Sequence, residues 1–182
     1  MRILKNDLKN ELNIRTEKNF PKEGIEFIDI MPLIIQKETF NEIIEKFEHE
    51  IQPKNVDYIV GPEARGLIIG AALSNKLGKG FIPVRKAGKL PPSTVERKFE
   101  YEKEYGKDTL ELPKLVNENY EGKSFYIVDD IYATGNTIKA IKDAIEQSGG
   151  IVKGVGVIMN IKELNNDTNI YSLLDINEEL KK

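Results

Sequence analysis

The sequence has no cysteine and only one histidine, so several common catalytic and metal-binding chemistries are missing from it. Without cysteine there can be no disulfide, no thiolate nucleophile and no cysteine-based metal site. The single histidine, His49, lies between Glu48 and Glu50 on the surface of a predicted helix, which favours a structural role. Catalysis is therefore expected to use carboxylates, lysine, arginine, tyrosine or a metal ion that the substrate carries, and no protein metal site is predicted.

The chain also lacks a long hydrophobic run and a strong excess of charge of either sign. No apolar stretch approaches the ~18–20 residues of a membrane-spanning helix, and residues 1–10 are charged, without an apolar signal region. The 27 lysines and arginines against 30 aspartates and glutamates leave a net charge of −3. This charge gives no electrostatic reason to expect nucleic acid as a partner. Together these absences predict a cytoplasmic protein that binds neither membrane nor nucleic acid.

What is present is an ordinary globular pattern of apolar residues. The 182 residues are 40% hydrophobic and 31% charged, which predicts one domain over residues 1–182. Strand-like apolar runs alternate with helical patterns: strands at 56–60 and 81–85 flank a helix at 65–77 that ends at Gly78. This alternation predicts an α/β fold with an open, mainly parallel twisted sheet flanked by helices.

Three polar segments do not fit this alternation. Residues 3–19 are charged with scattered leucine and isoleucine and predict an N-terminal helix. Residues 20–32 alternate in character between prolines and predict an extended segment or hairpin arm. Residues 86–106 are polar and rich in lysine, glutamate, glycine and proline. Because so long a segment is unusual as a simple connector, we interpret it as a functional loop or lid.

Residues 125–137 carry the clearest chemical signal of the chain, F-Y-I-V-D-D-I-Y-A-T-G-N-T. The apolar run predicts a buried parallel strand, which would end at the sheet edge where open α/β proteins bind ligands. The small residues of 133–137 offer backbone N–H groups, two threonine hydroxyls and a helix N-terminus, which suit a phosphate. Asp129 and Asp130 would repel a phosphate but can accept hydrogen bonds from sugar hydroxyls. The segment therefore predicts a ligand that carries both a sugar and a phosphate.

Two other phosphate-binding motifs are excluded by the sequence. A strand followed by aspartate also occurs in nucleoside-triphosphate hydrolases, but those proteins need a G-x-x-x-x-G-K-[ST] loop, which this chain lacks. The dinucleotide-binding fingerprint fails as well, because residues 154–156 supply only two of its glycines and follow no suitable turn.

The segment at 125–137 resembles the phosphoribosyl pyrophosphate (PRPP) motif of the type I phosphoribosyltransferases. Other segments resemble the adenine phosphoribosyltransferases in particular, and they occur in the order found in that family. They are F-P-K-E-G-I-E-F-I-D-I-M-P-L at 20–33, G-P-E-A-R-G-L-I-I-G at 61–70, V-R-K-A-G-K-L-P at 84–91 and E-Y-G-K-D-T-L-E-L at 104–112. The resemblance covers nearly all of residues 20–165.

This resemblance implies a type I phosphoribosyltransferase fold with a small N-terminal hood, about residues 1–34, and a flexible catalytic lid loop, about residues 86–106. It implies a purine-salvage reaction in which adenine and PRPP give AMP and pyrophosphate. The transition state should resemble an oxocarbenium ion, as in glycoside chemistry. Mg²⁺ is the expected cofactor, held mainly by PRPP and water, and a homodimer is the expected assembly.

The resemblance also assigns roles to residues of this chain. Asp129 and Asp130 should bind the ribose, and their charge, that of Asp130 above all, should favour the cationic sugar in the transition state. Glu104 is the expected acid/base on the purine. Phe27 should stack on the purine, whose edge the backbone of Glu26 and Ile28 should read. The 5′-phosphate should be bound by Ala133, Thr134, Gly135, Asn136 and Thr137, and the pyrophosphate by Arg65, Arg85, Lys86, Lys89 and Tyr105.

The chain departs from the family pattern at several positions. Asn136 stands where glycine is usual, and we expect it to tolerate a left-handed backbone. Ile28 replaces a commonly basic residue, and Pro92 replaces a common glycine at the start of the lid, which stiffens it. The lid segment 95–103 is about two residues longer than usual and strongly charged. Asn165-Asn166-Asp167 replace a frequent Gly-Arg, a change from which we expect little effect.

Two alternatives to adenine phosphoribosyl transfer remain open. The same fold could act on hypoxanthine, guanine or xanthine, because backbone contacts can exchange donor for acceptor without a change of sequence. A non-catalytic regulator that senses PRPP or purine would need a nucleic-acid-binding surface or an added DNA-binding domain. The acidic charge and the presence of Glu104, Arg65 and Lys89 favour an enzyme.

Overall fold

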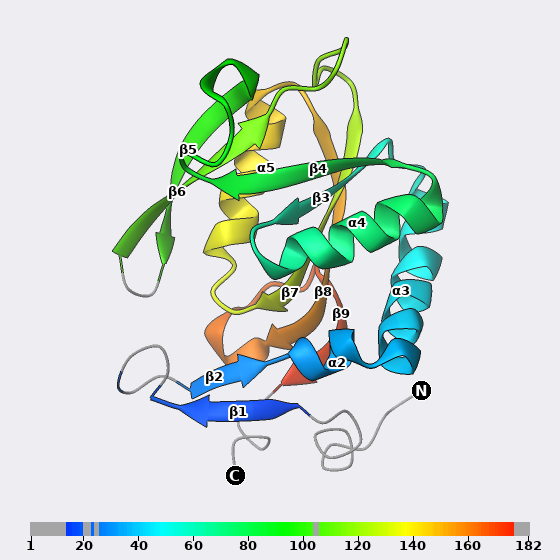
Figure 1. The fold of residues 1–182 in the computed structure, drawn as a ribbon, viewed down its shortest axis with the longest axis vertical. Coiled ribbons are helices and arrows are strands. Elements are labelled where there is room, and N and C mark those ends of the chain that lie inside the picture. The colour runs from blue at the N-terminus through cyan, green and yellow to red at the C-terminus, as the bar shows by residue number, and fades with distance from the viewer. Residues whose placement is uncertain (1–13, 20–22, 24–25, 104–105, 177–182) are drawn as a thin grey trace.

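A seven-stranded sheet forms the centre of the computed structural model, which describes residues 14–19, 23, 26–103 and 106–176 (Figure 1). Within these residues the strand order is β5-β6-β4-β3-β7-β8-β9. In this order the five strands β4, β3, β7, β8 and β9 are each parallel to their neighbours, whereas β6 is antiparallel to both β4 and β5. The strands are β3 (Tyr58–Pro62), β4 (Gly80–Lys86), β5 (Val95–Lys103), β6 (Gly106–Pro113), β7 (Ser124–Tyr132), β8 (Ile151–Ile161) and β9 (Tyr171–Ile176). The predicted open, mainly parallel sheet is confirmed.

Helices cover both faces of this sheet. Alternate residues of β7 point to opposite faces, so that Tyr126 packs in the core under α3 and α4, and Ile127 packs under α5. Phe47 of α3 and Ile69 of α4 lie in the first core, and Ile141 of α5 lies in the second. The helices are α2 (Met31–Ile35), α3 (Lys37–Ile51), α4 (Arg65–Leu77) and α5 (Asn136–Gln147). In the part of the chain that the structure describes, none of the helices combines the length and apolar character needed to span a membrane.

The predicted helix at 65–77 has the same bounds in the structure, and Gly78 ends it with a left-handed φ of 64°. By contrast, α3 begins earlier than its sequence indicates, since Thr39-Phe40-Asn41-Glu42 predicts a helix that starts at Thr39. Thr39 lies inside α3, which begins at Lys37, and its hydroxyl bonds to the Gln36 side chain at 3.2 Å. A serine or threonine followed three residues later by glutamate is typical of a helix start, but helical structure extends further toward the N-terminus here.

The N-terminal segment forms a hairpin where it is described. β1 (Arg15–Lys18) pairs antiparallel with β2 (Glu26–Asp29). The predicted helix over 3–19 is therefore wrong for Arg15–Lys18, and residues 3–13 lie outside the described part. Thr16 is half-buried between exposed neighbours, a period of two that belongs to a strand rather than a helix. The extended segment or hairpin arm predicted over 20–32 is confirmed for β2 and wrong for Met31 and Pro32, which begin α2, while residues 20–22 and 24–25 lie outside the described part.

The segment predicted as an irregular lid loop contains a strand. A short 3₁₀ turn, η2 (Pro92–Thr94), leads into β5, which pairs antiparallel with β6. Tyr101 is only 7% exposed and packs in the α5-side core together with Phe99. We call the β5–β6 hairpin the arm. Arg97 fixes the base of the arm to the end of α5, since its guanidinium donates to Ser148 Oγ at 3.1 Å and to the Gln147 carbonyl at 3.0 Å. The many charges of 95–103 hid the alternation of Arg97, Phe99 and Tyr101 that makes it a strand.

Candidate active site

Three neighbouring parallel strands end beside one another and place three loops at one edge of the sheet. β4, β3 and β7 lie next to each other in that order. The residues that follow them are the turn after Lys86, the turn 63–64 and the loop 133–135. In Figure 1 the β1–β2 hairpin lies below this edge and the β5–β6 arm lies above it. This arrangement is where an open α/β sheet binds its ligands.

The loop after β7 leads directly into α5. Gly135 has a left-handed φ of 80° and caps the helix, which begins at Asn136. The left-handed residue is thus Gly135, so the expected tolerance of Asn136 for this conformation is not needed. No side chain caps α5, and its first turn contains no acidic residue. The N–H groups and the positive end of the helix dipole are therefore available to an anion.

The two aspartates lie inside β7 rather than after its end, since Asp129 pairs in register with Val157. Asp130 is 7% exposed, and its Oδ2 lies 2.8 Å from Arg65 Nε. Asp129 Oδ1 accepts a hydrogen bond from the Asp130 backbone N–H at 2.9 Å. Burial, and then the neighbouring charge of Asp130, raise the pKa of Asp129 well above its usual range. The pair therefore resists carrying two full charges even with Arg65 beside Asp130, and a further cation close to Asp129 would favour its ionised form.

Arg65 begins α4 directly above the diacid, so the structure adds a contact that the sequence did not indicate. The Arg65 side chain as a whole is 28% exposed. The predicted role of Arg65 in pyrophosphate binding stays a prediction, and its ion pair with Asp130 connects that role to the ribose-binding carboxylates.

The cationic turn at the end of β4, residues 85–89, is held by two glutamates that the sequence did not single out. Glu63 Oε2 accepts from Arg85 Nε at 2.9 Å and from the Lys86 backbone N–H at 3.0 Å. The Lys86 N–H, and then the Arg85 guanidinium, lower the pKa of Glu63. Glu111 Oε1 accepts from the N–H of Gly88 at 3.1 Å, where φ is 77°.

These glutamates lie in two of the segments that resemble the family, yet no local spacing marks them. Glu63 precedes α4, and Glu111 lies in β6 opposite Arg85. Their partners are 22 or more residues away in the sequence. Lys86 and Lys89 are exposed, which leaves their ammonium groups accessible to an anionic ligand.

The predicted base-binding and acid/base residues are only partly described. Glu104 and Tyr105 lie outside the described residues, between the ends of β5 and β6. The backbones of Glu26, Phe27 and Ile28 belong to β2, whose other edge pairs with no strand in the described part of the chain. That free edge keeps backbone donors and acceptors available, whereas the Ile28 side chain packs against the α3–α4 core. The roles of these residues stay predictions.

Residues 34–179 match the sequence pattern of the phosphoribosyl transferase domain. The chain belongs to this family.

The similarity extends to adenine phosphoribosyltransferases in sequence and in structure, which confirms the predicted family and fold. The chain is 44% identical over 158 residues to the adenine phosphoribosyltransferase of Clostridium tetani, covering 87% of this chain and 88% of that one. It is 45% identical over 159 residues to that of Clostridium acetobutylicum, covering 87% and 89%.

Two solved structures show how far the phosphoribosyltransferase fold is shared. The adenine phosphoribosyltransferase of Thermoanaerobacter pseudethanolicus superimposes with a TM-score of 0.82 at 40% identity, over 92% of this chain and 99% of that one. The enzyme of Saccharomyces cerevisiae, solved with adenine and an imino-altritol bisphosphate, gives a TM-score of 0.80 at 36% identity, over 92% and 99%.

Proposed function

We propose that this chain transfers the 5-phosphoribosyl group of PRPP to adenine and releases AMP and pyrophosphate in purine salvage. The proposal rests on three features that meet at one sheet edge. They are the loop and helix start at 133–137, called the phosphate loop, the diacid Asp129–Asp130 and the cationic turn 85–89. Adenine is proposed as the base because the relatives at 44–45% identity are adenine phosphoribosyltransferases.

The ribose 5-phosphate half of PRPP is proposed to bind along β7 and α5. The N–H groups of residues 133–137, with the hydroxyls of Thr134 and Thr137, hold the phosphate at the uncapped end of α5. Asp129 and Asp130 accept from the ribose hydroxyls. As positive charge develops on the ribose, the partly buried diacid gains a cation that stabilises its ionised form, so this interaction is stronger in the transition state.

The pyrophosphate half is proposed to bind the cations after β3 and β4. Arg65, Arg85, Lys86 and Lys89 surround it, and Tyr105 closes on it from the arm. Mg²⁺ is proposed to be held mainly by PRPP oxygens and water and to neutralise part of the negative charge that leaves. In the described part of the chain, no three acidic, histidine or cysteine side chains gather as a metal site, and we assign no protein ligand.

The purine is proposed to lie between the N-terminal hood and the arm. Phe27 stacks on its face, and the free edge of β2 at Glu26 and Ile28 reads its polar edge. Glu104 moves the proton that the purine must lose as its ring nitrogen forms the bond to the ribose. Closure of the arm excludes water from the cationic sugar. We also propose that the chain works as a homodimer.

One assay tests the proposal against both alternatives. The protein is mixed with PRPP and Mg²⁺, and adenine, hypoxanthine, guanine and xanthine are offered separately while nucleotide and pyrophosphate are measured. We expect AMP to form at least tenfold faster than any other nucleotide. If another nucleotide forms instead of AMP, the assignment of adenine as the substrate base is wrong. If PRPP binds but no nucleotide forms, the regulator is favoured.

A further inference from the structure

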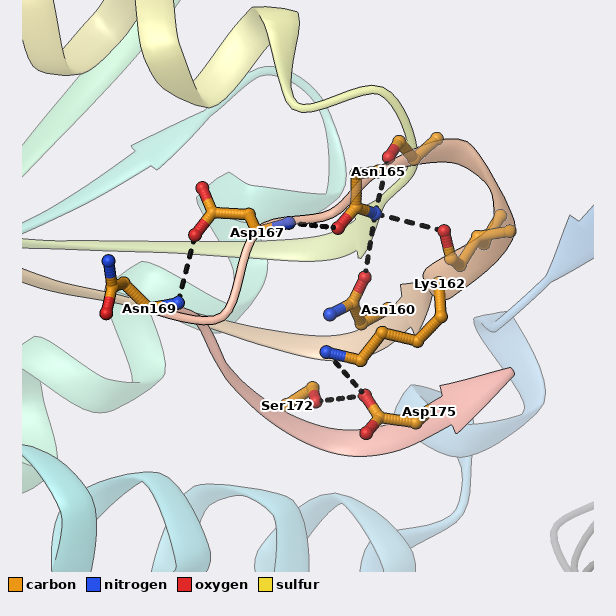
Figure 2. Close-up of polar contacts among 9 residues, drawn as sticks. Asn160, Lys162, Asn165, Asp167, Asn169, Ser172 and Asp175 are labelled. Carbon is orange, nitrogen blue, oxygen red and sulfur yellow. Dashed lines mark hydrogen bonds and ion pairs between the residues drawn. The ribbon is translucent and has the colours of Figure 1, made fainter. Parts of the chain in front are cut away.

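The connection between β8 and β9 contacts the phosphate loop through side chains that none of the proposed roles uses. It begins with a 3₁₀ turn, η3 (Lys162–Leu164), and continues to Tyr171. Figure 2 shows Asn165 and Asp167 at the centre of a network of hydrogen bonds that reaches β8 and the chain after β7. These residues replace the Gly-Arg that is frequent in the family, a change from which the sequence alone predicts little effect.

Asn165 is the hub of the network. Its Nδ2 carries two N–H groups that are shared among three acceptors, the Ala133 carbonyl at 2.8 Å, the Ile161 carbonyl at 3.0 Å and Asn160 Oδ1 at 3.0 Å. Asn160 is fully buried and lies opposite Tyr132 in the pairing of β7 with β8. An amide nitrogen is needed here, because a carboxylate of the same size can only accept hydrogen bonds.

The bond to the Ala133 carbonyl sets the direction of a backbone donor in the phosphate loop. In a trans peptide the C=O and the following N–H are coplanar and point in opposite directions. With the Ala133 carbonyl held toward Asn165, the N–H of Thr134 must point to the other side of the loop. That N–H is one of the donors that we assign to the 5′-phosphate.

A second contact supports the same loop from beneath. The Tyr132 hydroxyl donates to Asp167 Oδ2 at 3.2 Å, and the ring is 6% exposed. A Cβ added to Gly135 would overlap that hydroxyl, so the end of the ring lies directly against Gly135. Burial, and then the charge of Asp167, raise the pKa of Tyr132 to about 12, so the hydroxyl keeps its proton in the physiological range.

Asp167 is itself held in place by the connection. Its backbone N–H donates to Asn165 Oδ1 at 3.2 Å, and its Oδ1 accepts from the Asn169 N–H at 2.9 Å. The two contacts with the phosphate loop are therefore coupled through the bond between Asn165 and Asp167 (Figure 2).

We propose that Asn165 and Asp167 are positioning residues that hold the phosphate loop in its binding conformation before the ligand arrives. A loop ordered in advance loses less conformational freedom on binding, so affinity for the 5′-phosphate rises without a new ligand contact. The inference rests on the proposed function only in taking the 5′-phosphate of a nucleotide or of PRPP as the ligand of this loop.

The test compares four variants of the full chain by calorimetric titration with AMP and by steady-state kinetics. Asn165→Ala removes the donor. We expect AMP affinity to fall and the KM for PRPP to rise, each by about tenfold, which is the upper end of what the loss of one neutral hydrogen bond costs. The KM for adenine and the kcat should change less than about twofold. Asp167→Ala, at an exposed position, and Tyr132→Phe should each weaken AMP binding by about two- to fourfold.

Asn166→Ala is the matched control, since Asn166 is the exposed neighbour of both positions. It should leave AMP affinity unchanged. The proposal is overturned if Asn165→Ala, Asp167→Ala and Tyr132→Phe all bind AMP as the parent does, or if kcat falls while AMP affinity stays. If Asn165→Ala does not fold, the other two variants decide.

The controls also separate this inference from the proposed function. If the parent protein binds GMP or IMP but not AMP, the base is wrong, and the same variants are titrated with that nucleotide. If the parent binds no 5′-nucleotide and no PRPP, both the proposed function and this inference fail.

Discussion

The loop after β7 and the turn after β4 lie at the same sheet edge, but they are built differently. The loop offers backbone N–H groups at the start of α5, and the residues that form it are consecutive. The turn offers cationic side chains, and its conformation depends on Glu63 and Glu111, which come from other strands or turns. The binding groups of the loop are therefore readable in the sequence. The partners that hold each region in place, Asn165 for the loop and the two glutamates for the turn, are brought near only by the fold.

The largest effect should come from a residue outside both regions. If the loop and the turn only bind the substrate, the proton transfer is left to Glu104, so Glu104→Gln should lower kcat by about 10²- to 10⁴-fold. The affinity for PRPP should remain within a few-fold of the parent value. Single-turnover kinetics with equilibrium binding of PRPP separate the two quantities. A variant with parental turnover would remove Glu104 from this role.

The two glycines of these regions test how tightly each is packed. Gly135 and Gly88 both have a left-handed φ, 80° and 77°. A Cβ at Gly135 would overlap Tyr132, whereas a Cβ at Gly88 would meet nothing within 4 Å. We expect Gly88→Ala to cost about 1 kcal/mol of unfolding free energy. Gly135→Ala should cost roughly 2–4 kcal/mol and weaken AMP binding at least tenfold.

Urea unfolding and AMP titration of both glycine variants measure this difference. Equal losses of stability would show that the ring of Tyr132 moves aside readily and that the loop is no more tightly packed than the turn.

Replacing Glu63 should damage the turn and spare the loop. Glu63→Gln loses the charge that holds Arg85, so the KM for PRPP should rise by about tenfold while AMP, which has no pyrophosphate, binds normally. Since the folded-state pKa of Glu63 is lowered, its ion pair stabilises the fold above the unfolded pKa, ordinarily 4.5, and the stability is lost as pH falls through the folded pKa. The stability gap between parent and variant, measured by urea unfolding at pH 7 and pH 4, should therefore narrow once the pH falls below 4.5. A weakened AMP affinity would contradict the separation of the two regions.

The smallest effect is a gain in stability at the diacid. The pKa of Asp129 is raised in the folded state, so at pH below its ordinary value of 3.8 both states are protonated and Asp129→Asn changes little. As pH rises above 3.8, the parent loses stability relative to the variant until the folded pKa is passed. Thermal melts should therefore show the variant a few degrees more stable at pH 7.5, with its activity reduced. Equal melting temperatures at that pH would mean that burial of Asp129 is harmless.

Much of the fold could be predicted because its signals are local. The helix at 65–77 was predicted to the residue, since its apolar spacing and the stop at Gly78 lie within the segment itself. The strand at 95–103 was missed because charged residues alternate with those that face α5, and the sequence alone does not show that α5 lies there. The hairpin strand at Arg15–Lys18 was missed because it depends on pairing with β2, a partner that its own sequence does not reveal.

By itself the sequence determined the reaction class, because strand, diacid, phosphate loop and helix start are consecutive in residues 125–137. It also indicated the sheet, whose strands carry their own apolar runs. Only the tertiary structure decided that Arg65 neutralises Asp130, that Glu63 and Glu111 hold the cationic turn, and that Asn165 contacts Ala133. Hydrogen bonds and ion pairs act over a few ångströms in space, and their partners here are 22 to 65 residues apart along the chain. No local pattern records such distances.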